Sequence, residues 1–69
     1  MNNYLFAYYE NKKINFKEIP AKSLADFKNK FVRWAFDKWD FVESEEYNTL
    51  IQELNLEHIY ISEIKELDV

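Results

Sequence analysis

The sequence predicts a small α+β domain with the element order β-β-α-α-β, in which two helices pack on one face of a three-stranded sheet. Segments rich in β-formers lie near both ends of the chain, and two stretches with apolar residues at helical spacing lie between them. A chain of 69 residues has room for one domain, residues 1–69. With 48% hydrophobic and 19% aromatic residues, a packed core is expected rather than disorder.

The first two strands are expected to form a hairpin. Residues 4–9 are a run of Tyr, Leu, Phe and Ala that is too short for a helix. The polar stretch after it contains Asn11, which tolerates a positive φ and therefore favours a tight turn into a second strand at 14–19. Pro20 lacks an N–H for the strand ladder, so we expect it to end this strand.

Two amphipathic helices are predicted in the middle of the chain. Ser23 is placed to cap the first, which runs to about residue 39 with Asp26 in its positive first turn. Ser44 is placed to cap the second, and Asn55 is a plausible end for it. The apolar stripes are Leu24, Phe27, Phe31, Trp34 and Ala35 in the first helix, and Tyr47, Leu50, Ile51 and Leu54 in the second.

Residues 57–62 alternate in polarity and are predicted to form the third strand, while Ile64 and Leu67 fall out of phase and suggest a short turn or helix. The first strand is apolar on both faces, which favours a central position and the strand order 2-1-3. If the two helices run up and back, the third strand lies parallel to the first.

The sheet has only two helices to cover it, so one face should carry exposed side chains. In the second strand, Ile14 and Phe16 share one face, and Asn15 and Lys17 share the other. For the uncovered face the sequence leaves two registers open. It carries either Tyr4, Phe6, Tyr8 and Tyr60, or Leu5, Ala7 and Tyr9.

Charge is divided between the two parts of the chain. Residues 1–40 carry eight basic groups against five acids, and residues 41–69 carry eight acids against Lys65 alone, within a total of −4. Such asymmetry indicates a partner that reads charge. An acidic chain disfavours nucleic-acid binding, which depends on Lys and Arg neutralising phosphates, although exposed aromatics on a sheet resemble a stacking platform.

The segment 34–41 is apolar nearly all round, so one helix face cannot bury all of it. Trp34 lies on the buried stripe, whereas Trp39 is as plausible on the surface as in the core. Large aromatics that remain exposed are typical anchors of protein interfaces. The glutamates of the second helix could add charge that selects a basic partner, or they could simply be solvated and satisfy the helix dipole.

No residue pattern indicates catalysis, and no cofactor is expected. The chain has no glycine for a phosphate-binding loop and no cysteine, and His58 is its one histidine. A lone imidazole beside Glu57 fits a surface residue better than a general base or a metal ligand. We therefore expect a protein that is not an enzyme and holds no metal.

Size, acidity, an isolated α+β domain and a composition typical of AT-rich coding resemble those of small phage or mobile-element inhibitors, including anti-CRISPR proteins. The resemblance is to the class as a whole and rests on no motif, so it assigns no functional residue. It implies binding to a host effector that handles nucleic acid, often through an acidic surface.

The leading hypothesis is a non-enzymatic protein-binding module, of the kind of a phage inhibitor, that docks on a larger protein with a basic surface, such as a CRISPR effector. The alternatives are a self-associating homodimer module and a single-stranded nucleic-acid binder. The N-terminus resembles no signal peptide and no window resembles a membrane span, so a cytoplasmic protein is expected, in the host cell if it is phage-encoded. The candidate partner-binding residues are Phe36, Trp39, Phe41, Glu43, Glu45, Glu46, Glu53 and Tyr60.

Overall fold

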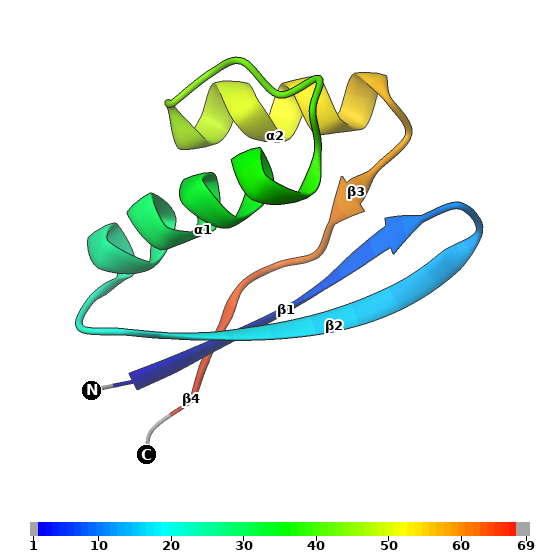
Figure 1. Cartoon of the computed structure of the whole chain (residues 1–69). Helices are drawn as coiled ribbons and strands as arrows, with labels where there is room; N and C mark the ends of the chain where they lie inside the picture. Colours follow the sequence, from blue (N-terminus) through cyan, green and yellow to red (C-terminus); the bar gives the residue numbers. More distant parts are fainter. Residues whose placement is uncertain (1, 68–69) are drawn as a thin grey trace.

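The computed structural model describes residues 2–67 and confirms the predicted α+β class. Both helices lie on the same side of an antiparallel sheet, and the other side is uncovered (Figure 1). The elements in chain order are β1 (Asn2–Glu10), β2 (Lys13–Ala21), α1 (Leu24–Lys38), α2 (Tyr47–Leu56), β3 (Tyr60–Ile61) and β4 (Lys65–Leu67).

The predicted hairpin is confirmed, with Glu10 opposite Lys13 at its closed end. Asn11 and Lys12 form the two-residue turn with φ of 53° and 65°, the pair of positive values that a type I′ turn requires. Pro20 does not end the strand, which continues to Ala21. In an antiparallel edge strand every second residue directs its N–H and C=O away from the neighbour, so a proline is tolerated there.

The strand order 2-1-3 is confirmed, but the predicted parallel orientation of the third strand is wrong, because β3 is antiparallel to β1. The reason is the connection between the helices. Instead of turning tightly, residues 39–46 return along the helix layer until Tyr47, at the start of α2, lies beside Lys28 and Phe31 of α1. The two helices therefore run in the same direction (Figure 1). Trp39 and Val42 hold this segment in place by entering the core.

β3 and β4 pair with the same edge of β1 and together form an interrupted strand. β3 lies opposite Tyr8 and Tyr9, and β4 lies opposite residues 3–5. The turn or helix predicted for the segment that contains Ile64 and Leu67 is therefore wrong, because Lys65–Leu67 form a strand. Ser62 bridges the interruption, since its N–H donates to the Ala7 carbonyl and its hydroxyl accepts from the Ala7 N–H, both at 2.8 Å. A side chain thus replaces part of the ladder at this position.

Phe6 lies at the centre of an aromatic core between the sheet and α1. Its ring centroid is 5.1 Å from that of Phe31 and 5.4 Å from that of Trp34, and both contacts are edge-on, as aromatic quadrupoles favour. The core is closed by α2 through two leucines that are fully buried. The buried residues are Tyr4, Phe6, Ile19, Ala21, Phe27, Phe31, Val32, Ala35, Trp39, Val42, Leu50, Leu54 and Ile59.

The helix starts were predicted in part. Ser23 caps α1 as expected, with its hydroxyl 3.2 Å from the Asp26 N–H. The Lys22 N–H in turn donates to Asp26, which holds the pKa of that carboxyl below its usual value. For α2 the predicted cap is wrong, because Glu46 and not Ser44 takes this position.

The end of α2 lies one residue beyond Asn55, at Leu56. His58 follows with φ of 62°, a left-handed conformation more often filled by glycine, and its N–H donates to the Asn55 carbonyl. Neither helix is long and apolar enough to cross a membrane.

Candidate protein-binding surface

Trp39, a proposed binding anchor, lies in the core and is only 6% exposed. Its ring packs edge-on against Trp34 with centroids 5.2 Å apart, and its Nε1 donates to the Glu10 carboxylate at 2.7 Å. This bond ties the segment after α1 to the end of β1. The apolar surplus of residues 34–41 is thus largely absorbed by the fold, because the chain leaves the helix and directs Trp39 inward.

Two of the glutamates proposed to bind a partner accept hydrogen bonds from backbone N–H groups. The Glu46 carboxylate accepts from the Thr49 N–H at 3.0 Å and thereby caps α2. The Glu53 carboxylate accepts from the N–H groups of Glu43 and Ser44 and thereby fixes the loop before the helix. Local hydrogen bonding therefore accounts for both carboxylates.

Four of the five remaining candidates line two separate hollows. Phe36 and Glu45 line one, beside Arg33, where the connection before α2 passes α1. Phe41 and Tyr60 line another, of about 520 Å³, at the turn end of the sheet. Glu43 is exposed and lines neither of them. The structure therefore joins Phe41 with Tyr60 but separates this pair from Phe36.

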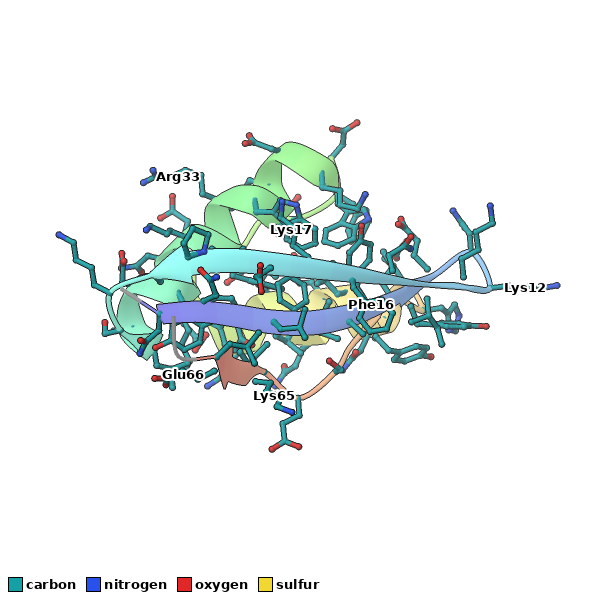
Figure 2. All side chains as sticks on the ribbon, turned by 90° about the horizontal axis from the view of Figure 1, so that it is seen from below. Lys12, Phe16, Lys17, Arg33, Lys65 and Glu66 are labelled. Carbon is teal, nitrogen blue, oxygen red and sulfur yellow. The ribbon has the colours of Figure 1, made fainter. Side chains whose placement is uncertain are left out.

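The uncovered face of the sheet carries four of the seven large apolar side chains that are exposed in residues 2–67. Its register is the second of the two alternatives, since Leu5, Ala7 and Tyr9 face away from the helices while Tyr4 and Phe6 are buried beneath them. Phe16 lies opposite Ala7 and is 72% exposed, and Ile14 is 64% exposed. Figure 2 shows Phe16 on this face with no helix in front of it. The open-face patch consists of Leu5, Ala7, Tyr9, Ile14, Phe16 and Tyr60.

A hollow of about 260 Å³ lies within the open-face patch. Small side chains form its floor, because Ala7 stands opposite Phe16 on one side and beside Ser62 on the other. Tyr9 and Tyr60, with ring centroids 6.3 Å apart, form the wall that it shares with the hollow containing Phe41. The exposed apolar surface therefore continues around the turn end of the sheet.

The two edges of the sheet differ in charge. The β2 edge and its turn carry Lys12, Lys13 and Lys17 against Glu18, and Figure 2 shows Lys17 and Arg33 on this side. The opposite edge, residues 57–67, carries three glutamates against one lysine. On the open face itself the two borders carry Glu18 and Lys65, because both lie opposite Leu5, whereas Lys13 and Lys17 lie opposite Glu10 and Phe6 and share the other face.

Phe16 and Ile14 were not among the residues singled out from the sequence. Their alternation with Asn15 and Lys17 was visible, but such a pattern ordinarily turns the apolar side toward the core. Here the aromatic side chains of β1 already fill the space beneath the helices, and Asn15 and Lys17 share that side at the sheet edge. The available signal was that β1 is apolar on both faces, which allows either face to be the covered one.

Within residues 2–67, no three histidine, aspartate or glutamate side chains are grouped closely enough to hold a metal ion. The His58 Nδ1 lies 3.3 Å from the Tyr60 hydroxyl, and the imidazole is exposed at the surface. Burial raises the pKa of Tyr4, as it does that of Tyr47, so neither phenol is prepared to act as a base at neutral pH.

Comparison with known proteins gives no relative from which a function could be transferred. No family model matches the sequence, and neither a curated protein nor a solved structure matches the chain.

Proposed function

We propose that this chain is a non-enzymatic protein-binding module and that the open-face patch is its contact surface. The observation that carries the proposal is the exposure of Phe16 and Ile14, beside Tyr9 and Tyr60, on a face that no helix covers. Grouped apolar side chains of this size on a small domain are typical of protein interfaces. The hollow beside them can accept a protruding side chain, which supports a specific contact rather than nonspecific hydrophobic association.

A capture experiment with matched variants tests this function. Wild type, Phe16→Asp and Leu56→Asp are immobilised and exposed to a lysate of a low-GC bacterium, with and without nuclease treatment, to which untagged chain has been added. Leu56 is the control, because it is 79% exposed but lies on α2, on the helix side of the molecule. The two variants therefore differ in the face on which the new charge is placed, while both substituted side chains are exposed.

The expected result is a polypeptide, either the untagged chain or another protein, that wild type and Leu56→Asp retain and Phe16→Asp does not. Equal retention by all three contradicts the proposal. Binding that disappears on nuclease treatment also contradicts it, because the aromatic face would then be a nucleic-acid platform with its lysines on phosphate.

A second candidate is an inhibitor that docks on a basic, nucleic-acid-handling protein through its acidic side. It is favoured by the charge of residues 41–69 and by Glu57, which lines the same hollow as exposed Phe41. Complementary charge of this kind sets partner choice and association rate. Because Glu46 and Glu53 bind backbone amides, a charge test has to avoid them.

Glu43→Lys with Glu45→Lys makes the appropriate variant, because both side chains are exposed. Glu18→Lys with Asp37→Lys is its control, since it changes the total charge equally within the basic part of the chain. The docking candidate predicts that only the first pair abolishes retention of basic host proteins. If both pairs reduce retention equally, only net charge matters and this candidate is wrong.

A further inference from the structure

We propose that the partner of the open-face patch is a second copy of this chain, stacked face to face about a two-fold axis parallel to the strands. The inference rests on the proposed function, because it takes the open face to be a protein interface. Two independent features of that face support a self-complementary contact, namely its shape and the charge of its borders.

The shape argument starts from Phe16, which protrudes next to the hollow but does not line it. β2 and β3 lie on opposite sides of β1. Rotation about an axis that follows β1 therefore places β2 of one copy over β3 of the other. Phe16 and Ser62 lie on either side of Ala7, at the same level along the strands, so Phe16 of the second copy arrives over Ser62 and the hollow. The same operation seats Phe16 of the first copy in the second hollow, as an isologous contact requires.

Neighbouring residues agree with this arrangement. Ile14 and Tyr60 both lie level with Tyr9, on its two sides. The rotation therefore places Ile14 of each copy over Tyr60 of the other, so that all of the most exposed apolar side chains of the face become covered. Sheets stacked with nearly aligned strands are a common mode of packing, and the sheet twist is accommodated by a modest angle between them.

Charge selects the same axis. With the axis parallel to the strands, Glu18 of one copy lies over Lys65 of the other, because both residues are level with Leu5, on its two sides. With an axis across the strands, β2 lies over β2 and this pairing of opposite charges is lost. Pairing of two β2 edges side by side brings the lysines of both edges together, and Pro20 and the Lys30 ammonium on the Pro20 carbonyl obstruct one end of that edge.

The first test is the mass in solution, measured by sedimentation equilibrium up to high micromolar concentration. We expect twice the 8.5 kDa of one chain for wild type and for Leu56→Asp, and the mass of one chain for Phe16→Asp. Circular dichroism verifies that Phe16→Asp retains its fold. A monomeric wild type overturns the inference, and so does a dimer that Phe16→Asp leaves intact.

The second test is cross-linking, for which the chain is suited because it has no cysteine of its own. An Ile14→Cys chain mixed with a Tyr60→Cys chain should form the mixed disulfide in preference to either homodisulfide. Preferential linkage of Ile14→Cys to itself means that β2 contacts β2, which overturns the arrangement.

The two proposals fail separately. If wild type is monomeric but retains another protein through Phe16, the self-association is wrong and the protein-binding function stands. If Phe16→Asp changes neither mass nor retention, both proposals are wrong.

Discussion

The two faces of the sheet are built from the same strands but differ in burial. On the covered face, Phe6 contacts Phe31 and Trp34 and is 1% exposed. On the open face, Phe16 is 72% exposed. It lies on β2 next to Lys17, the residue that pairs with Phe6, and therefore points to the opposite side of the sheet. The core is filled without Phe16, so the folded chain gains little from this residue unless something else covers it. The difference separates residues that maintain the fold from residues available for contact.

The largest expected effect tests this separation directly. Phe6→Ala removes a ring from the centre of the core, and such truncations cost about 3–5 kcal/mol, most of the stability of a small domain. Phe16→Ala should change the free energy of unfolding by about 0.5 kcal/mol or less, because its ring is in water. Urea titration at protein concentrations low enough to keep copies apart measures both. Equal losses would show that the open face belongs to the folding core of the single chain.

A second expectation concerns the border between the faces, at the end of β1. Glu10→Ala leaves the Trp39 Nε1 without its carboxylate partner, and a hydrogen bond to a charged group contributes about 1.5–3 kcal/mol. Glu10→Gln retains an oxygen acceptor and should lose less. Glu18→Ala, on the exposed side of β2, serves as the control and should leave the urea midpoint nearly unchanged. A Glu10→Ala midpoint equal to that of Glu18→Ala would mean that the bond contributes nothing to stability.

Local signals predicted the elements well, because they depend on neighbours in the sequence. The positive φ of Asn11 and the Ser23 cap follow from the chemistry of those side chains, and the structure confirms both. The orientation of β3 could not be derived in the same way. It depends on where Trp39 and Val42 find room in the core, and that is a property of the assembled helix layer.

The candidate surface was harder to predict than the fold. Exposure of Tyr60 and Phe41 is consistent with their selection, but Trp39 is buried, and the choice between surface and core depended on one peptide unit turning inward after α1. Phe16 was overlooked for a related reason. Alternation shows that two residues share a face, but the covered face is decided by the strand that supplies the bulkier side chains, here β1.

A third expectation concerns the turn that joins β1 and β2 and therefore both faces. Lys12 has a φ of 65°, a conformation that costs a non-glycine residue free energy. Lys12→Gly should raise the free energy of unfolding by about 0.5–1 kcal/mol, because Asn-Gly is the preferred type I′ pair. Lys13→Gly, at the first residue of β2, is the matched control and should lower it, because glycine is unfavourable in a strand. Thermal unfolding of both variants shows whether the positive φ is the cause.

The smallest expected effect is the acid dependence contributed by Asp26, which joins the start of α1 to the end of the sheet. The Lys22 N–H, and secondarily the Lys30 ammonium at 3.3 Å, hold the pKa of Asp26 below 3.8 in the folded chain. A carboxyl with a depressed pKa stabilises the fold above its unfolded pKa, and this stabilisation is lost as the pH falls through the folded value. Asp26→Asn should therefore make the decline in the free energy of unfolding below about pH 4 less steep, because an asparagine takes up no proton on unfolding. Urea titration across this pH range measures the decline. A slope that Asp26→Asn leaves unchanged would mean that this carboxylate contributes nothing to the acid dependence of stability.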